Sequence, residues 1–264
     1  MTDTTLMSCF ESEKKIINVT SLDRIETNSS SKGNQIKWYK DNQFIKFNTW
    51  QWYEAVSEVM VSQLLKHTNI AEYVSYYPCT IIEDGQLLGD GCYSNNFLKN
   101  GEQDITFARI LKNSGISLMD ASFDVVRDTI FDVTGLDVKE YIGNCLCLDA
   151  ITYNEDRHLN NFSLIRTTTG YRTAPIFDNG LACLSDIFTY PFSADLDENL
   201  SKVKAKPFST NFITQIKDNM ITPIYLDIES FLNNIKATSK EEQRALEVIK
   251  KGLKHREGIA WERY

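Results

Sequence analysis

Residues 149–180 read DAITYNEDRHLNNFSLIRTTTGYRTAPIFDNG, and this stretch decides the fold. An apolar helical run enters it, and two strand-like runs, NFSLIR and YRTAPIF, follow on either side of TTTG. These runs predict a β-hairpin that turns near Thr169 and Gly170. Several polar side chains lie between the helix and the hairpin. A polar stretch in such a place is usually a solvated loop without a function of its own.

The hairpin register predicts where the polar side chains meet. Positions paired across a hairpin have numbers that sum to a constant, and Asn161 plus Asp178 gives 339, with its midpoint at 169.5 in the turn. We therefore expect these two residues to face each other at the open end, beside Asp156. Two carboxylates and an amide oxygen are hard ligands of the kind that Mg²⁺ takes when it holds nucleotide phosphates.

The N-terminal part predicts a small sheet and a buried helix. The runs QIKWYK and QFIKF, separated by Asp41 and Asn42, indicate a hairpin that carries Lys46 near its end. Residues 51–66 are apolar almost all the way round, which indicates a helix buried on several sides. Glu54 and Glu58 share one face of it, and a buried carboxylate needs a cationic partner. Lys46 is the nearest candidate, and either glutamate could pair with it.

The rest of the chain turns from strands to helices. Residues 77–98 predict further strands with glycine-containing turns. Asp137 and Glu140 resemble a capping box at the start of the helix that enters the opening stretch, and Ser239 with Glu242 predicts another near the C-terminus. A β-rich N-terminal part therefore precedes a helical C-terminal part, and the fold class is α+β.

The order of the motifs indicates phosphoryl transfer. The spacing Asp-x-x-x-x-Asn from Asp156 to Asn161 matches the kinase catalytic loop. Asp178, in Asp-Asn-Gly after an apolar strand, stands where the kinase Asp-Phe-Gly aspartate stands. Lys46 in FIKF resembles the strand lysine of VAIK. Each match is weak alone, but together they follow the order of a kinase.

These residues carry a family resemblance. The segments LDAITYNEDRHLNNFSLI and APIFDNG resemble the HipA-like bacterial serine/threonine kinases and, more distantly, the phosphatidylinositol 3/4-kinase-like catalytic core, which share a D-R-H-x-x-N or D-x-H-x-x-N loop. KAKPFSTNF (204–212) is similar to compact HipA-like members. The resemblance extends over residues 30–264 and is specific around 149–185. It implies a two-lobed protein-kinase-like fold, with a small β-rich N-lobe in residues 1–98 and a larger, mainly helical C-lobe in residues 99–264.

The resemblance also implies roles for individual residues. Asp156 would be the catalytic base, Asn161 and Asp178 the Mg²⁺ ligands, and Lys46 the phosphate-binding lysine. His158 would either support the transferred phosphoryl group or bond the loop backbone, and Arg157 would be structural. The helix partner of Lys46 would be Glu58 or Glu54. By its order in the chain, CYSNNFL places the adenine site at Asn96, Phe97 and Leu98.

The sequence departs from the family before the lysine strand. A glycine-rich phosphate loop is expected there, but SSSKGNQIKWYK offers only Gly33. HipA-like kinases can autophosphorylate a serine in that loop, so Ser29, Ser30 and Ser31 are candidates, although such serine clusters are also typical of solvated linkers. From its length of 264 residues, we expect the chain to lack the extra N-terminal domain of the full-length toxin.

The first functional hypothesis is an ATP- and Mg²⁺-dependent serine/threonine protein kinase of the HipA-like type that autophosphorylates. The alternatives are a small-molecule or lipid kinase on the same core and a nucleotide-binding pseudokinase, the last disfavoured because Lys46, Asp156, Asn161 and Asp178 are all present. The partners would be a protein substrate with a Ser/Thr acceptor and, as for toxin relatives, an antitoxin or regulatory protein.

The overall composition bounds the partners and the location. With 28 basic against 36 acidic residues, the chain predicts no nucleic-acid partner. It has no apolar run that could span a bilayer, and its first residues lack a signal core. We therefore expect a cytoplasmic protein, although a secreted or translocated effector would fit the family equally.

Overall fold

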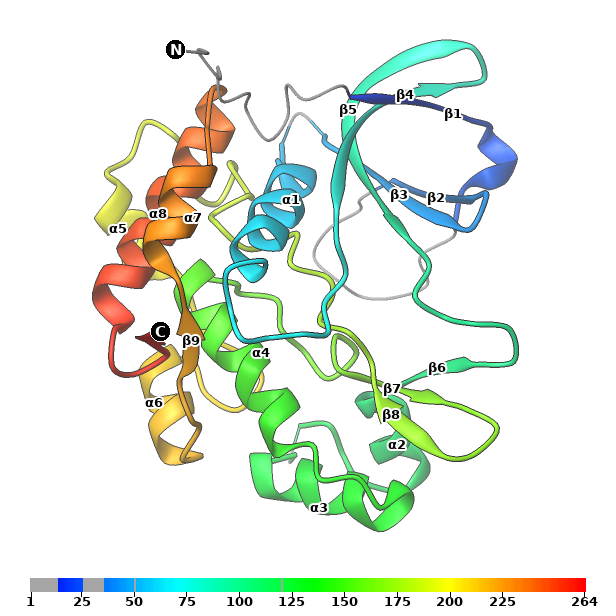
Figure 1. Cartoon of the computed structure of the whole chain (residues 1–264), viewed down its shortest axis with the longest axis vertical. Coiled ribbons are helices and arrows are strands. Elements are labelled where there is room, and N and C mark those ends of the chain that lie inside the picture. Colours follow the sequence, from blue (N-terminus) through cyan, green and yellow to red (C-terminus); the bar gives the residue numbers. More distant parts are fainter. Residues whose placement is uncertain (1–13, 26–35, 50, 120) are drawn as a thin grey trace.

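The structure is a computed structural model that describes residues 14–25, 36–49, 51–119 and 121–264. Five strands of the N-terminal part form one curled sheet in the order β1-β4-β5-β3-β2 (Figure 1). β1 runs parallel to β4, and the other neighbours are antiparallel. The strands are β1 (Lys15–Val19), β2 (Lys37–Lys40), β3 (Gln43–Phe47), β4 (Tyr77–Glu83) and β5 (Gln86–Asn95), of which only β1 was not predicted.

The β2–β3 hairpin is as predicted. Asp41 and Asn42 have φ angles of 49° and 61°, the left-handed values that a type I′ two-residue hairpin turn requires of both its residues. The register places Lys37 opposite Lys46. Two lysines therefore lie side by side on one face of the sheet.

The first helix, α1 (Glu54–Leu65), lies between the sheet and the helical part. All its residues except Gln63 are buried, which confirms the prediction of all-round burial. It begins later than residue 51 because Trp52 forms a β-bridge with Asp186 and Tyr53 donates its backbone N–H to Ser185. Tertiary pairing here overrides the local helical pattern.

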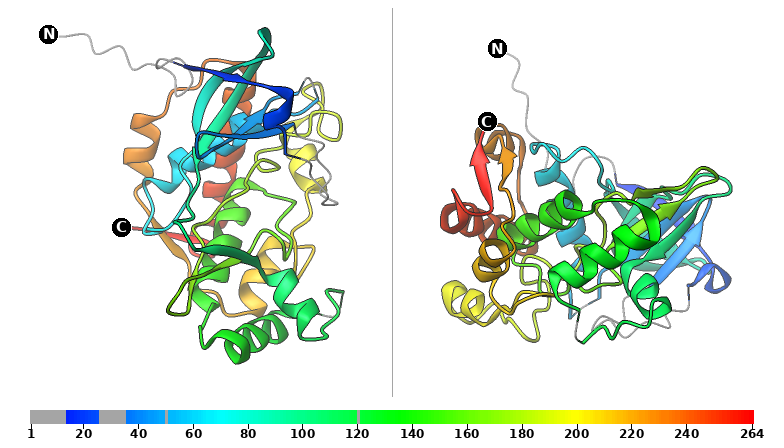
Figure 2. Two further views of the ribbon diagram at one scale, coloured as in Figure 1. Left: turned by 90° about the vertical axis from the view of Figure 1, so that its right-hand side faces the viewer. Right: turned by 90° about the horizontal axis from the view of Figure 1, so that it is seen from below.

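The C-terminal part is mainly helical (Figures 1 and 2). Its helices are α2 (Phe107–Asn113), α3 (Phe123–Thr134), α4 (Lys139–Thr152), α5 (Leu196–Lys202), α6 (Phe212–Asp218), α7 (Ile228–Asn234) and α8 (Lys240–Arg256). A three-stranded sheet in the order β6-β7-β8 consists of β6 (Gln103–Thr106), β7 (Ser163–Arg166) and β8 (Tyr171–Thr173). β9 (Ile224–Leu226) and β10 (Trp261–Arg263) pair in parallel. A 3₁₀ turn, η1 (Ser21–Asp23), follows β1.

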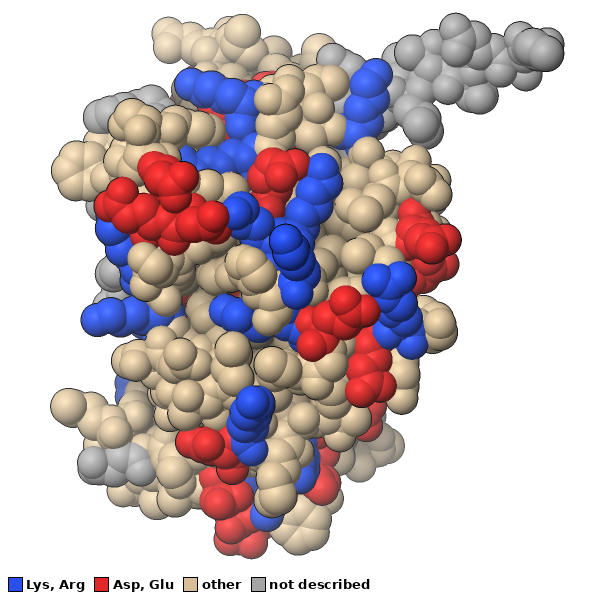
Figure 3. Space-filling model, turned by 90° about the vertical axis from the view of Figure 1, so that its left-hand side faces the viewer, with Lys and Arg blue, Asp and Glu red and all other residues tan. Residues whose placement is uncertain are grey.

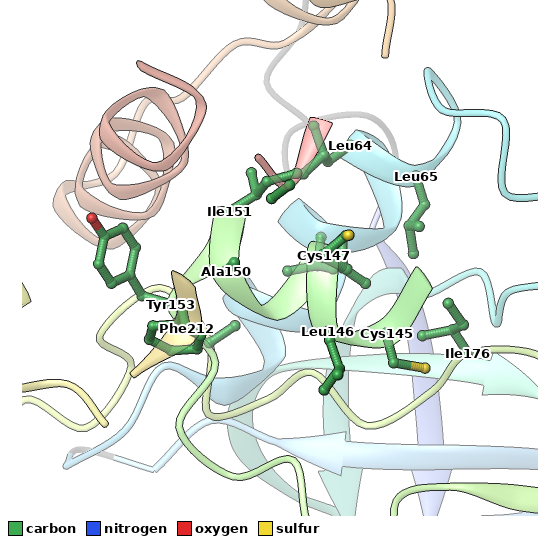
Figure 4. Close-up of a cluster of buried hydrophobic side chains, with 14 of the residues drawn as sticks. Leu64, Leu65, Cys145, Leu146, Cys147, Ala150, Ile151, Tyr153, Ile176 and Phe212 are labelled. Carbon is green, nitrogen blue, oxygen red and sulfur yellow. The ribbon is translucent and has the colours of Figure 1, made fainter. Parts of the chain in front are cut away.

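Helix α4 lies at the centre of the larger hydrophobic core. Its residues Cys145 to Ile151 pack among Leu64 and Leu65 of α1 and Ile176 (Figure 4). Helix α8 approaches it closely at Gly252, where an added Cβ would lie 1.8 Å from the carbonyl oxygen of Ile151. A smaller, separate core lies in the five-stranded sheet and consists of Ile17, Val19, Trp38, Ile45, Cys79 and Ile81. Two cores are what two lobes require.

Two predicted helix starts differ in detail. The box at Asp137 and Glu140 is wrong: α4 has Val138 as its N-cap without a side-chain cap, and the Asp137 carboxylate accepts the backbone N–H of Lys139 instead. At α8, Ser239 caps the helix by accepting the N–H of Glu242, as predicted. The Glu242 carboxylate accepts hydrogen bonds from the backbone N–H and hydroxyl of Thr238.

The β7–β8 hairpin forms, but its expected register is wrong by two. Ile165 pairs with Arg172, so paired numbers sum to 337. The ladder stops at Ser163 and Ala174, and Asp178 follows in a left-handed conformation with φ 59°. Asn161 and Asp178 are therefore not ladder partners, because the chain leaves the hairpin before it reaches them.

The surface over the helical part carries both signs of charge. Figure 3 shows basic and acidic side chains interspersed on this face, and pairs such as Lys251 with Asp197 on α5 account for some of the contacts. Within the described residues, no helix is both long enough and apolar enough to cross a membrane.

Candidate active site

Lys46 on β3 is the cation at the centre of the site. Its Nζ forms a buried ion pair with Glu58 of α1 and donates to Asp178 Oδ1 at 2.9 Å. Burial opposes the charged form, but the Asp178 and Glu58 carboxylates outweigh it and raise the pKa of Lys46. The ammonium therefore stays charged and joins the strand, the helix and the loop after β8.

Glu58, not Glu54, is the partner of Lys46. Its second oxygen accepts the backbone N–H of Asn179 at 2.9 Å, so one carboxylate fixes both the lysine and the Asp-Asn-Gly turn. Burial raises the pKa of Glu58, and Lys46 counteracts this. For Asp178 burial would also raise the pKa, but Lys46 and then Lys37 more than offset it, so the net shift is downward and Asp178 is ionised.

Asp156, Asn161 and Asp178 line one small cavity together with Lys37 and Glu54. The hairpin ladder does not bring them together. Instead, the Asn161 amide donates to the backbone carbonyl of Asp156 at 2.9 Å, which closes the loop on itself. The three residues that the sequence predicted to meet therefore line one cavity, although the predicted hairpin register that was to bring Asn161 and Asp178 together is wrong.

Arg157 fixes the positions of these loops through its hydrogen bonds. It is fully buried, and its five hydrogen bonds reach the Asp149 carboxylate twice, the Asn179 side chain, and the backbone carbonyls of Asn161 and Phe177. The guanidinium therefore ties α4 to both loops of the site. Its predicted structural character agrees with these contacts.

His158 lies beside Asp156 without a close bond. Its Nε2 is 3.8 Å from Asp156 Oδ2, and its buried Nδ1 has no hydrogen-bond partner among the described residues. The expected alternative, a ring bonded to the loop backbone, is not seen. The imidazole therefore lies near Asp156, the proposed base, without a hydrogen bond to it.

Two lysines complete the site, and sequence reasoning gave neither of them a role. Lys206, in the loop before α6, donates to Asp156 Oδ1 at 3.1 Å. Lys37 lines both the small cavity and the neighbouring cleft. The hairpin register could have revealed Lys37, because like charges directly opposite each other disfavour pairing unless an anion lies between them. Lys206 is 50 residues from Asp156, and although it lies in the KAKPFSTNF segment, nothing in that segment shows which residue it contacts.

An apolar cleft adjoins Lys46 and Asp178. Its apolar lining consists of Ile25, Phe44, Ile45, Val74, Tyr76, Phe97 and Phe177. Phe97 stacks on Phe177 with ring centroids 5.9 Å apart. Of the three residues predicted for adenine, only Phe97 lines the cleft.

The other two predicted adenine residues, Asn96 and Leu98, do not line the cleft. Asn96 donates its amide to the Tyr39 hydroxyl at 3.2 Å and accepts the backbone N–H of Leu98 at 3.0 Å. Their backbone and side-chain groups close a turn beside the β2–β3 hairpin. Ser29, Ser30 and Ser31 lie outside the described residues.

The oxygen ligands of the cavity suit a magnesium ion. Since the Asn161 amide nitrogen is bonded to Asp156, its Oδ1 is left as an acceptor, and Asp178 Oδ2 accepts no hydrogen bond from the described residues. The described residues contain no cluster of three His, Cys, Asp or Glu side chains built as a metal centre. Mg²⁺ takes one or two protein oxygens and completes its shell with phosphates and water, so this donor set fits it.

Comparison with solved structures establishes the fold. The crystal structure of CtkA, a proinflammatory kinase from Helicobacter pylori, matches with a TM-score of 0.62 at 15% identity, over 90% of this chain and 95% of that chain. This likeness confirms the predicted α+β, two-lobed kinase-like fold.

A second similar structure is more distant. HipA from Shewanella oneidensis MR-1, in a toxin–antitoxin complex with HipB and operator DNA, has a TM-score of 0.46 at 13% identity, over 88% of this chain and 65% of that chain. That likeness carries no functional argument. No protein-family model and no curated protein matches the sequence.

Proposed function

We propose that this protein is an ATP- and Mg²⁺-dependent kinase that phosphorylates serine or threonine in a protein. One observation carries the proposal: Lys46 contacts both Glu58 and Asp178, and Asp178 shares a cavity with Asp156 and Asn161. An ion-paired strand lysine, an acidic loop residue and a loop Asp/Asn pair are the parts that phosphoryl transfer uses.

Each part has a task in the transfer. The adenine would enter the apolar cleft against Phe97 and Phe177. Lys46 and Lys37 would face the phosphates, since both line that cleft beside Asp178. Asn161 and Asp178 would hold Mg²⁺, which neutralises phosphate charge when bound.

The chemical step would occur at Asp156. The acceptor hydroxyl oxygen forms a bond to the γ-phosphorus while the bond to the β,γ-bridging oxygen breaks and ADP leaves. The hydroxyl proton passes to the Asp156 carboxylate. Lys206, at 3.1 Å from this carboxylate, would balance charge on the acceptor side.

The HipA-like type of kinase and autophosphorylation at Ser29, Ser30 or Ser31 belong to the same proposal. They rest on the sequence resemblance, and so do the more distant relation to the phosphatidylinositol 3/4-kinase-like core and a regulatory or antitoxin partner.

The test is label transfer. Purified wild-type protein and Asp156→Asn are incubated with Mg²⁺ and radiolabelled ATP, and labelled residues are mapped by mass spectrometry. Label on wild type alone is expected, at Ser29 to Ser31 or in the segment after Asp178. Nucleotide binding without label would overturn protein phosphorylation and favour a small-molecule acceptor or a pseudokinase. Equal label on Asp156→Asn would overturn the role of Asp156.

A further inference from the structure

Helix α1 presents two carboxylates to the site, and only one of them is paired. Glu58 is bonded to Lys46 and to Asn179. Glu54, one turn earlier, is 6% exposed, and its carboxylate makes no hydrogen bond or ion pair with any described residue. Burial raises its pKa to about 7, and Lys46 only partly opposes this. Such a group is costly unless it serves a ligand.

The neighbouring backbone makes room for this carboxylate. Glu54 lines the small cavity with Asp156, Asn161 and Asp178. Gly180, the last residue of Asp-Asn-Gly, also lines it, and an added Cβ there would lie 3.2 Å from Glu54 Oε2. A glycine at this position therefore leaves the Glu54 side chain its place in the cavity.

The chemistry of the cavity selects a cation as the occupant. Asp156, Asp178 and Glu54 bring three carboxylates to it, and Asn161 adds an amide oxygen. Lys46 is already engaged by Glu58 and Asp178, and Lys206 by Asp156. Of these carboxylates only Glu54 lacks a partner among the described residues, and Lys37, which also lines the cavity, forms no ion pair with it there. The carboxylates do not form a three-residue metal centre in the described part of the chain, so Glu54 suits the hydration shell of an ion better than direct ligation.

We propose that Glu54 is an outer residue of the divalent-cation site and accepts hydrogen bonds from water bound to the ion held by Asn161 and Asp178. The inference rests on the proposed function, which supplies that ion. It adds a residue for which the kinase motif has no counterpart: the motif glutamate is Glu58, one turn farther along α1. Partners of this kind change metal affinity by about 10- to 100-fold.

The experiment measures cation binding directly. Mn²⁺ is titrated into the full-length protein with ADP, and free Mn²⁺ is followed by electron paramagnetic resonance. Wild type is compared with Glu54→Gln, with Asp178→Asn, and with Glu72→Gln as the control, because the Glu72 side chain is exposed and does not line the cavity. Circular dichroism establishes that each variant is folded, and Glu54→Asp tests whether a shorter carboxylate restores part of the affinity.

The expected results separate the two proposals. Wild type and Glu72→Gln bind Mn²⁺ equally, Asp178→Asn loses binding, and Glu54→Gln weakens it by about 10-fold. If Glu54→Gln binds like wild type while Asp178→Asn does not, the Glu54 inference is overturned and the cation site stands. If wild type binds no Mn²⁺ with ADP, the cation site itself is overturned, and the role of Glu54 falls with it.

Discussion

Two buried cationic clusters lie next to each other in this protein, and they differ in how completely they are paired. Arg157 has five N–H donors, and all five are used by Asp149, Asn179 and backbone carbonyls. Lys46 uses two of its three donors, and its partner Asp178 keeps one oxygen open. Glu54 beside it has no partner in the described chain.

The difference separates architecture from chemistry. In the Arg157 cluster every donor is hydrogen-bonded, so this closed network fixes the geometry of the loops and has no donor left for a substrate. An open network retains unsatisfied charge that a ligand must complete, and its folded state is less favourable until that ligand binds. Substitutions in the first cluster should therefore act on stability, and substitutions in the second on ligand binding and turnover.

The largest effect is expected from Arg157→Met. Removing the guanidinium leaves the Asp149 carboxylate buried without its cation, which costs about 3–5 kcal/mol in the free energy of unfolding. Chemical denaturation measures this loss. The control is Arg166→Met at the exposed end of β7, which should change stability by less than about 0.5 kcal/mol. A stable but inactive Arg157→Met would show that the closed cluster takes part in the chemistry.

Glu54→Gln should instead stabilise the protein free of ligand at high pH. The pKa of Glu54 rises from 4.5 to about 7 on folding, so between these values the unfolded chain releases a proton that the folded chain retains. Wild-type stability therefore falls as pH rises through this window, by about 3 kcal/mol from this group, and the amide removes that loss.

Denaturation curves at pH 4 and pH 8 test this expectation. The variant should gain stability over wild type at pH 8 and little at pH 4, whereas Glu72→Gln should track wild type at both. No gain at pH 8 would mean that the Glu54 carboxylate has a hydrogen-bond or ionic partner in the folded protein. The Lys46 cluster would then be as fully paired as the Arg157 cluster.

The sequence reveals those parts of the site that local pattern determines. The β2–β3 hairpin, helix α1 and the Asp156 loop follow from turn residues, apolar spacing and motif spacing. The register of β7–β8 does not, because the Thr167 N–H bonds Gly170 and tightens the turn, and Asp178 lies beyond the ladder. Only tertiary packing decides that Glu58 rather than Glu54 meets Lys46, or that Lys206 reaches Asp156 from another loop.

Lys206→Met tests the comparison at the side of the cavity where the acceptor would bind, next to Asp156. Its side chain is 41% exposed, so its ion pair with Asp156 contributes little to stability. If it balances charge in the transition state, its loss should lower kcat by about 10- to 100-fold with KM for ATP nearly unchanged. Lys206→Arg should restore part of the rate. Lys202→Met, four residues earlier and paired with Glu198, is the control. A rise in KM alone would place Lys206 at the nucleotide.

Lys37→Met is expected to have the smallest effect, and on the opposite kinetic constant. Lys37 pairs with Lys46 across the β2–β3 hairpin and lines the cleft where the phosphates would lie. Lys46 is paired with Glu58 and Asp178, whereas Lys37 forms no ion pair with a described residue, so its charge is available to an anion. Losing one charge-assisted contact to phosphate should raise KM for ATP by about 5- to 10-fold, with a small change in kcat. The matched control is Lys40→Met, three residues along the same strand, whose Nζ bonds the Asn18 carbonyl instead. Equal KM values for Lys37→Met and Lys40→Met would show that Lys37 does not contact the ATP phosphates. Lys37→Met would then change mainly KM for ATP, and Lys206→Met mainly kcat. This difference would divide the cavity into a nucleotide side at Lys37 and an acceptor side at Lys206.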